Sequence, residues 1–319
     1  MYKKIIKKIK EYQNINIVRH IGVDPDALAS QVALRDSLRK SFPEKKVIAT
    51  GNSSIRFNYF PKLDKQELMD NALLIVVDTP DLKRIDCPHV NEHKEIIKID
   101  HHPLIDDFGG IELIDTQSSS ASELILKLIV DADLHMDQDI AETLFMGIVG
   151  DTNRFLYSTS SETFSLVSNL LNKYDMNITR LYSNIYMRPL NEIRLQGYIS
   201  QNMKVTDYGM AYILITDEIM KQFSVDSGSA GNMVNMYNNI EEIVLWFTIS
   251  EDTKNELYKF NIRSRGPVIN EIAEKYNGGG HKFAAGARVK TIEEVKSLVA
   301  DLGLVCEEYK RGQESNENK

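Results

Sequence analysis

Cysteine is scarce in this sequence. Only Cys87 and Cys306 occur among 319 residues, and they lie far apart without the spacing of metal ligands. Such a pair argues against a disulfide framework and against a zinc knuckle. We therefore expect a protein of the reducing cytoplasm.

Long apolar runs are also missing. A membrane-spanning helix needs about 20 predominantly apolar residues, whereas runs such as residues 72–77 have only the length of a strand. The amino-terminal MYKKIIKKIKEYQN lacks the apolar centre and cleavage site of a signal peptide. It predicts an amphipathic helix with Ile5, Ile6 and Ile9 on one face, and binding of its lysines to a membrane surface is the less favoured alternative. We expect no membrane partner.

An excess of positive charge is absent as well. The chain has 46 acidic and 38 basic residues, which give a net charge of −8 and an isoelectric point near 5.5. Tight binding of long duplex DNA or RNA depends on neutralising many phosphates. The composition therefore argues against long duplex nucleic acid as a partner, but a small anionic substrate at a local site stays open.

The order of predicted elements divides the chain into parts. Short β-rich runs alternate with helical periodicity in the first half, which predicts an α/β domain with a mostly parallel sheet flanked by helices. Its later part predicts helices across 121–149 and 160–200. The second half predicts a smaller α+β domain with a mixed sheet. The expected boundaries are a first domain at 1–187, a helical linker at 188–205, a second domain at 206–311 and a disordered tail at 312–319.

Acidic and histidine side chains follow the predicted strands. The carboxyl ends of parallel strands meet at one edge of a sheet, where catalytic residues gather. Carboxylate oxygens and imidazole nitrogens suit manganese or magnesium better than a thiol-loving metal. The candidates of this kind are His20, Asp24, Asp26, Asp78, Asp100, His101, His102 and Asp151.

Several of these candidates also have a purely structural explanation. Asp24 and Pro25 can open a helix as its N-cap and first helical residue. Asp78 can cap the turn that Thr79 begins. The Asp-His-His run at 100–102 is harder to explain in this way, because three titratable residues directly follow an apolar strand.

A glycine run marks the second half of the chain. Residues 278–280 are all glycine and precede His281. Such a run can terminate a helix, or it can let backbone N–H groups approach a phosphate. Arg263 and Arg265, on a predicted strand, are equally compatible with plain surface charges. The residues alone leave these alternatives open.

Five segments resemble the motifs of the DHH phosphoesterases, a family named for Asp-His-His. HIGVDPDALAS, VVDTPD, IDHHP and GIVGDTNRF look like its four motifs in order, and NGGGHKFAAG looks like the signature of the DHH-associated C-terminal domain. The resemblance extends over residues 15–290. Within the family the chain is most similar to nucleases of short oligoribonucleotides that also act on 3′-phosphoadenosine 5′-phosphate (pAp), and to cyclic-di-AMP pathway enzymes that split pApA.

The resemblance implies a set of ligands and substrate contacts. It assigns His20 and Asp24 to one metal ion, and Asp26, His101 and Asp151 to a second, with Asp78 bridging both. His102 would lie beside the substrate phosphate, with Asp100 orienting the histidines from behind. The implied cofactors are two Mn2+ ions, with Mg2+ or Co2+ as substitutes. The implied substrate-binding residues are Arg263, Ser264, Gly278, Gly279, Gly280 and His281.

The implied activity is 5′-directed hydrolysis of short oligoribonucleotides. Short oligoribonucleotides (nanoRNA), including pApA, would give mononucleotides, and pAp would give AMP, through a water activated by two metals. A homodimer is compatible with this reading. The rivals are an inorganic pyrophosphatase or exopolyphosphatase of the same superfamily and a nucleotide-sensing regulator with an inactive site. The sensor is disfavoured because all six expected ligands are present.

Two positions depart from the family pattern. Pro25 stands where glycine is frequent, so the backbone there must accept a φ of about −65°. Asn153 also stands where glycine is common, and asparagine tolerates a left-handed backbone better than most residues do. Neither departure removes a ligand.

Overall fold

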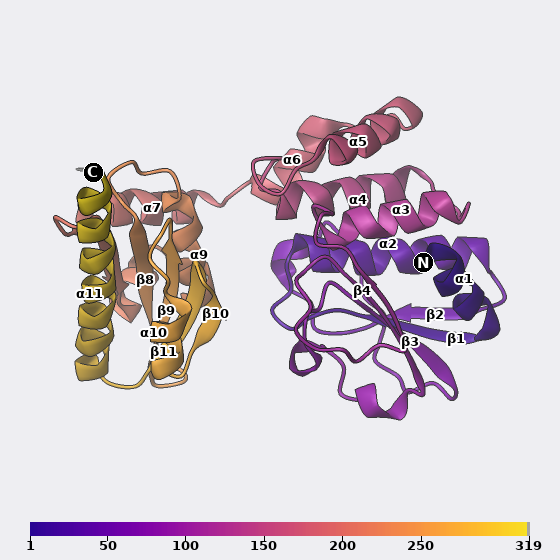
Figure 1. Ribbon diagram of the computed structural model, residues 1–319, viewed down its shortest axis with the longest axis horizontal. Helices are drawn as coiled ribbons and strands as arrows, with labels where there is room; N and C mark the ends of the chain where they lie inside the picture. Colours follow the sequence, from indigo (N-terminus) through magenta and orange to yellow (C-terminus); the bar gives the residue numbers. More distant parts are fainter. Residues whose placement is uncertain (318–319) are drawn as a thin grey trace. The chain divides into compact units, whose positions relative to one another are not determined.

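The computed structural model describes residues 1–317, with side chains described as far as Gln313. The chain forms two compact units, Met1–Met187 and a second that begins at Arg188 (Figure 1). Each unit has its own apolar core.

The first unit is built on a parallel sheet of five strands. The strand order is β2-β1-β3-β4-β5, with all neighbours parallel. β3 is buried along its whole length, as expected of an apolar strand at the centre of a parallel sheet. The strands are β1 (Asn14–Val18), β2 (Lys46–Ala49), β3 (Ala72–Val77), β4 (Glu95–Asp100) and β5 (Ile111–Ile114).

Helices cover one face of this sheet, while the other face is covered by loops and short 3-10 turns. The amphipathic prediction for the first helix is confirmed, since Ile5, Ile6 and Ile9 are its buried residues. The helices are α1 (Tyr2–Glu11), α2 (Pro25–Ser41), α3 (Ala121–Asp131), α4 (Gln138–Asp151), α5 (Ser161–Lys173) and α6 (Ile178–Tyr186). The 3-10 turns are η1 (Ile55–Phe57), η2 (Leu82–Arg84) and η3 (Val90–Glu92).

The helix expected across residues 121–149 is two helices. α3 ends at Asp131, and Asp133 takes a left-handed φ of 51°. Asp137 then caps α4, because its side chain accepts a hydrogen bond from the Ile140 N–H. A local turn and a new cap therefore outweigh the helical periodicity of the sequence.

The second unit is built on a mixed sheet of six strands. The order is β10-β11-β9-β8-β7-β6, in which only the β7–β8 pair is parallel. The predicted fold class, α/β followed by a smaller α+β unit, is confirmed. The strands are β6 (Lys204–Val205), β7 (Met210–Ile215), β8 (Leu245–Asp252), β9 (Leu257–Ser264), β10 (Gly279–His281) and β11 (Ala284–Val289). The helices are α7 (Leu190–Asn202), α8 (Asp217–Gln222), α9 (Ser227–Asn232), η4 (Met233–Tyr237), α10 (Asn270–Lys275) and α11 (Ile292–Glu317).

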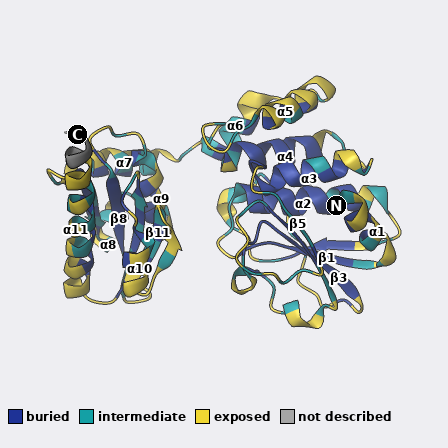
Figure 2. Cartoon of the chain, viewed as in Figure 1, coloured by how far each residue is buried: buried dark blue, intermediate teal, exposed yellow. Residues whose placement is uncertain are grey.

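The expected linker at 188–205 belongs to this second unit. Its helix α7 buries Leu195 and Ile199 against β7 and β8 residues such as Ile213 and Trp246. Figure 2 shows that the residues coloured as buried are concentrated on the strands and on the inward faces of the helices. The segment is therefore a packed element of the second core and not a free connector.

The tail is helical where a disordered segment was expected. α11 continues through Glu317, so the prediction of disorder was wrong for 312–317, and 318–319 lie outside the described residues. Contacts one turn apart support this end, because Arg311 pairs with Glu307 and Gln313 Nε2 donates to the Tyr309 hydroxyl at 2.8 Å. None of the helices in the described part of the chain is long and apolar enough to cross a membrane.

Gly147 allows α4 to pack closely on its neighbours. A Cβ at this position would lie 2.0 Å from Ser122 Oγ and 2.7 Å from Ala29 Cβ. We predict that Gly147→Ala destabilises the protein by roughly 1–3 kcal/mol in urea unfolding, because the core would be overpacked. The matched control is Gly197→Ala in α7, where nothing lies within 4 Å of the new Cβ. That change should stabilise by up to about 1 kcal/mol, and equal effects of the two substitutions would contradict the packing argument.

Candidate metal centre

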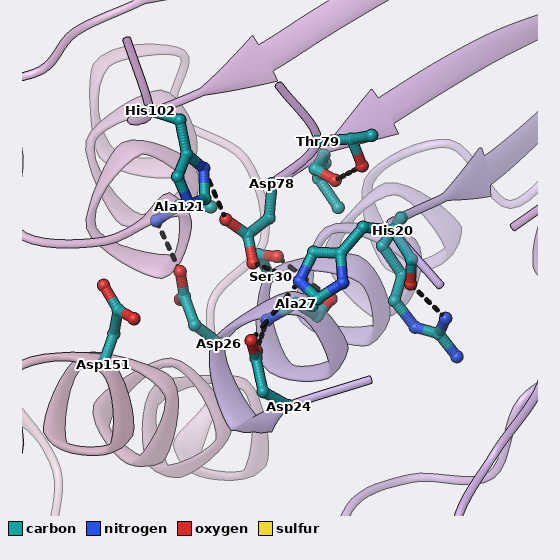
Figure 3. A network of polar contacts seen from close by, with 12 residues as sticks. His20, Asp24, Asp26, Ala27, Ser30, Asp78, Thr79, His102, Ala121 and Asp151 are labelled. Carbon is teal, nitrogen blue, oxygen red and sulfur yellow. Dashed lines mark hydrogen bonds and ion pairs between the residues drawn. The ribbon is translucent and has the colours of Figure 1, made fainter. Parts of the chain in front are cut away.

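The candidate residues of the first unit meet at the carboxyl edge of the parallel sheet. β1, β3 and β4 lie side by side, and Val77 on β3 is level with Ile99 on β4. The residues that follow these strands therefore leave the sheet at the same height. Figure 3 shows the side chains of Asp24, Asp26, Asp78 and Asp151 directed into one space.

The first group consists of His20, Asp24 and Asp78. His20 Nε2 lies 3.3 Å from Asp24 Oδ2 and 3.4 Å from Asp78 Oδ2. Asp24 also caps α2, because its Oδ1 accepts the Ala27 N–H at 2.9 Å, and Pro25 is the first helical residue. The two explanations of Asp24 are thus compatible: one oxygen caps the helix, and the other faces His20.

The second group consists of Asp26, His101 and Asp151. His101 Nε2 lies 3.6 Å from Asp151 Oδ2 and 4.0 Å from Asp26 Oδ2. Asp151 is the last residue of α4, and Asp26 lies on the first turn of α2. His101 Nε2 also lies 3.4 Å from Asp78 Oδ1, which connects this group to the first.

Asp78 belongs to both neighbourhoods. One of its oxygens faces His20 and the other faces His101. Its backbone φ is 51°, and its buried Oδ1 makes no well-formed hydrogen bond, while His101 Nε2 and His102 Nδ1 lie 3.4 and 3.5 Å from it. A buried carboxylate oxygen without a partner is costly unless a cation or a donor satisfies it. The donor set and this unsatisfied oxygen fit divalent cations with oxygen and nitrogen ligands.

The amino terminus of α3 holds Asp26. The carboxylate accepts the backbone N–H of Ala121 at 2.7 Å and of Ser122 at 2.8 Å. Helix amino termini favour anions in this way. The sequence analysis missed this contact, although Ser120 three residues before Glu123 is a recognisable capping pattern.

Asp100 orients His102. Its Oδ1 lies 2.8 Å from His102 Nδ1 and accepts the His102 backbone N–H at 3.2 Å. His102 Nδ1 lies 3.5 Å from Asp78 Oδ1. A buried carboxylate behind an imidazole fixes both its tautomer and its direction.

Lys98 is a further buried residue that the sequence analysis missed. Its Nζ donates to the carbonyls of Pro80 and Asp106, each at 2.9 Å, and lies 4.5 Å from the Phe108 ring centre. It thereby joins the loop after Asp78 to the loop after the Asp-His-His run. Only its polarity within an apolar strand could have signalled this role.

The carboxylates hold the two histidines in their charged form when no cation is bound. Burial opposes the charge, but Asp24 and Asp78 outweigh it and raise the pKa of His20 to about 10. Burial also opposes the charge of His101, but Asp78 and the other carboxylates around it outweigh burial and raise the pKa of His101 to about 10. Burial would raise the pKa of Asp78, but the two imidazoles hold it below its usual range.

Two further carboxylates of the centre, the buried Asp26 and the more exposed Asp151, behave in the opposite way. Burial, reinforced by repulsion from Asp78, raises the pKa of Asp26 to about 7. Burial and the Asp26 charge also raise the pKa of Asp151 well above its usual value. Without added positive charge, ionising all the carboxylates of the centre together is therefore unfavourable.

Loading with Mn2+ should therefore release protons. A histidine must be neutral to bind a metal, so His20 and His101 each have a proton to lose near neutral pH. We predict a release of at least about two protons per protein at pH of about 7.5, and an affinity that rises with pH up to about 10. Calorimetric titration of metal-free protein in Tris and in HEPES measures this release. Equal binding heats in the two buffers would show that the histidines are neutral before binding.

In the second unit, cross-strand register aligns Arg263 with His281. Arg263 pairs with Ala284, which in turn pairs with His281. The two side chains therefore share one face of the sheet. Arg263 is half-buried, and desolvation lowers the pKa of its guanidinium, whose Nη1 donates to the Ile262 carbonyl at 2.9 Å.

The structure does not bring Ser264 to this face. Ser264 pairs with Leu245 in the core on the opposite face, and its hydroxyl donates to the Pro267 carbonyl. The prediction of Ser264 as a substrate contact therefore needs correction. Side chains alternate along a strand, so neighbours such as Arg263 and Ser264 point to opposite faces.

The glycine run has a packing explanation at two of its three positions. A Cβ on Gly278 would lie 2.0 Å from the Gly286 carbonyl oxygen, and a Cβ on Gly280 would lie 2.5 Å from the Ala284 carbonyl oxygen. Gly279 meets nothing within 4 Å. Gly278 and Gly280 are therefore required by packing, although both are exposed to solvent, and Gly279 is half-buried.

Asn153 has the left-handed conformation that its departure from glycine suggested. Its φ is 45°, and Arg154 and Phe155 follow with φ of 66° each. The turn is held by the Arg154 N–H, which donates to the Val149 carbonyl at 2.9 Å. Asn153 therefore adopts here a backbone conformation that glycine would adopt without strain.

Comparison with known proteins places this geometry in context. Residues 14–148 match the DHH family, N-terminal domain, and residues 208–308 match the DHHA1 domain. The chain is 35% identical over 315 residues to the bifunctional oligoribonuclease and PAP phosphatase NrnA of Bacillus subtilis, covering 97% of this chain and 100% of that protein. It is 36% identical over 304 residues to the probable bifunctional oligoribonuclease and PAP phosphatase NrnA of Streptococcus mutans, covering 94% and 97%.

Solved structures agree with the fold. An exopolyphosphatase-related protein from Bacteroides fragilis superposes with a TM-score of 0.84 at 28% identity, covering 97% of this chain and 96% of that one. A pGpG-specific phosphodiesterase from Vibrio has a TM-score of 0.52 at 13% identity over 93% of this chain and 99% of that one, which supports the fold alone. The protein is a hydrolase that belongs to the DHH phosphoesterase family, with a DHH domain followed by a DHHA1 domain.

Proposed function

We propose that this enzyme hydrolyses short oligoribonucleotides, including nanoRNA and pApA, to mononucleotides and converts pAp to AMP, using two Mn2+ ions. The observation that carries the proposal is Asp78, whose two oxygens face two separate groups of histidine and aspartate ligands. Relatives that share over a third of their residues with this chain are named as oligoribonucleases and PAP phosphatases. The two cysteines are unpaired, in keeping with a reducing cytoplasm.

The side chains of the centre are assigned to two cation sites. His20 and Asp24 would hold one cation, Asp26, His101 and Asp151 the other, and Asp78 both. Two divalent cations held there supply Lewis-acid polarisation of a phosphoryl group and make a water molecule nucleophilic near neutral pH.

His102 is assigned to the substrate phosphate. Asp100 fixes its Nδ1 at 2.8 Å, so the ring keeps a single direction during a reaction cycle. As an imidazolium, the oriented ring could donate its Nε2–H to a phosphoryl oxygen as negative charge develops there. In the second unit, Arg263 and His281 share a face and would bind another part of the nucleotide.

A second candidate function is exopolyphosphatase activity, the hydrolysis of polyphosphate from its end. It is favoured by the similarity to the exopolyphosphatase-related protein, which covers almost the whole chain. The two candidates differ in substrate, since one requires recognition of a nucleoside and the other does not.

One set of assays separates these candidates. Metal-free protein would be given Mn2+, Mg2+ or Co2+ and then pApA, a three-nucleotide RNA, pAp, pyrophosphate or polyphosphate. We expect Mn2+-dependent release of AMP from pApA and pAp, with little phosphate from the inorganic substrates. Polyphosphate as the preferred substrate would establish the second candidate, and no turnover with any metal would support a sensor.

A further inference from the structure

Arg19 is a fully buried arginine directly before His20. It is 0% exposed, which for a guanidinium requires many partners. Nη1 donates to the His20 carbonyl at 2.7 Å and to Asp86 Oδ2 at 2.8 Å, and Nη2 donates to the Asn52 carbonyl. One side chain thus holds three segments that are far apart in the sequence.

Asp86 completes the network from the opposite side. Its Oδ2 also accepts the Asn52 N–H at 2.7 Å, and its Oδ1 accepts Asn52 Nδ2 at 2.8 Å. Its own N–H donates to the Arg19 carbonyl at 2.8 Å, while the Ile21 N–H donates to the Arg84 carbonyl at 2.7 Å. The segments 19–21, 51–52 and 84–86 are therefore locked together around one buried ion pair.

Gly51 allows this arrangement. Its φ is 136°, and a Cβ there would lie 2.8 Å from Asp86 Oδ2 and 3.5 Å from Arg19 Nη2. The backbone conformation and the close approach each require glycine. This is a second structural feature, independent of Arg19 itself, that serves the same network.

The network ends on the backbone of His20. Arg19 holds the His20 carbonyl, and His20 Nδ1 lies 2.9 Å from the next carbonyl, that of Ile21. A ring whose Nδ1 donates to that carbonyl presents Nε2 to Asp24 and Asp78, at 3.3 and 3.4 Å. Rotation of the 20–21 peptide would turn Nε2 away from both carboxylates.

A buried ion pair is weak support for stability, because its desolvation cost offsets most of the attraction. Arg19 therefore calls for another explanation than the stability of the fold. Removing an outer partner of a metal-binding histidine typically weakens metal affinity by about 10- to 100-fold.

We propose that Arg19, with Asp86 and Asn52, is a positioning unit that sets the direction of His20 and thereby the affinity of the His20–Asp24–Asp78 group for a divalent cation. The inference rests on the proposed two-metal function. It assigns to these residues no direct contact with substrate.

Mn2+ binding in two single-site backgrounds tests the proposal. Asp151→Ala removes a ligand from the His101 group and leaves the His20 group complete, whereas Asp24→Ala removes a ligand from the His20 group and leaves the His101 group complete. We expect Arg19→Lys to weaken Mn2+ binding by about 10- to 100-fold in the Asp151→Ala background and by less than about threefold in the Asp24→Ala background. Asn52→Ala removes the hydrogen bond that the exposed Asn52 side chain donates to Asp86. We expect it to weaken Mn2+ binding less than Arg19→Lys does, and again mainly in the Asp151→Ala background.

Arg35 provides the control. It is also buried, at 4% exposed, and donates to the Lys62 carbonyl at 2.7 Å and to Asp36 Oδ1 at 2.7 Å, but it lies more than two helical turns beyond Asp26. Arg35→Met should lower the melting temperature of the metal-free protein without changing either affinity. Equal losses at both sites, or wild-type affinity in Arg19→Lys and Asn52→Ala, would overturn the proposal. If the wild-type protein bound no Mn2+, or if neither background lost a site, the two-metal function itself would fail.

Discussion

Asp78→Asn should abolish hydrolysis while leaving the protein folded. The substitution keeps the size of the side chain but removes the charge that faces both His20 and His101. Lewis-acid stabilisation by bound metal is worth several kcal/mol, so we expect turnover to fall by about 10³-fold or more. Hydrolysis of pApA and pAp with saturating Mn2+, together with calorimetric titration of Mn2+, measures both effects.

Asp81→Asn is the matched control for Asp78. Asp81 lies three residues further along the same loop, where its Oδ1 accepts the Arg84 N–H at 3.1 Å and caps a 3-10 turn. It contributes to none of the ligand groups. We expect near-native turnover from this variant. Near-native turnover from Asp78→Asn would show that Asp78 does not bridge two ions, provided that both variants melt cooperatively.

The location of the centre could be predicted because it follows from the parallel direction of the strands. Parallel strands have their carboxyl ends on one side, so His20, Asp78 and Asp100 had to lie near one another once the sheet was recognised. The same reasoning could not say which oxygen of Asp78 faces which histidine. That detail depends on its left-handed φ of 51°, which no sequence periodicity encodes.

The supporting contacts were out of reach because they connect distant segments. Asp26 accepts hydrogen bonds from residues 95 and 96 positions away, and Arg19 meets Asp86 across 67 positions. Such pairs arise from the packing of α3 and of the 84–86 segment against the sheet edge, not from local propensity. Lys98 is hidden for a similar reason, because a lysine in a strand ordinarily predicts an exposed position.

The errors in the second half have local causes. Ser264 was expected to contact substrate together with Arg263 because the resemblance to the family implied both, but strand alternation turns it to the other face. The end of α11 was expected to be disordered from its polar composition, which describes solvent exposure equally well for a helix. In both cases, the geometry of the strand or helix decides the outcome, and neither a motif match nor composition contains that geometry.

The substrate role of the second unit predicts a selective loss of activity. Arg263→Ala and His281→Ala should each lower kcat/KM on pApA while leaving hydrolysis of bis(p-nitrophenyl) phosphate almost unchanged. A hydrogen bond to a charged group is worth about 1.5–3 kcal/mol, so the ratio of the two kcat/KM values should fall by about 10- to 150-fold. Steady-state rates on the two substrates, with the same enzyme preparation and Mn2+ concentration, give this ratio.

Arg265, two residues after Arg263, separates the effect on substrate recognition from the effect on stability. Its guanidinium donates to the carbonyls of Ile240 and Ile243, so it holds the chain before β8 and is committed to the fold. Arg265→Ala should lower the melting temperature. It should leave the ratio of the two kcat/KM values within about twofold of wild type, because Arg265 does not contact the substrate and so cannot stabilise the transition state. A ratio that falls equally in Arg263→Ala and Arg265→Ala would mean that the second unit affects activity only through stability. A ratio unchanged in both Arg263→Ala and His281→Ala would mean that the aligned face of β9 and β10 does not bind the nucleotide.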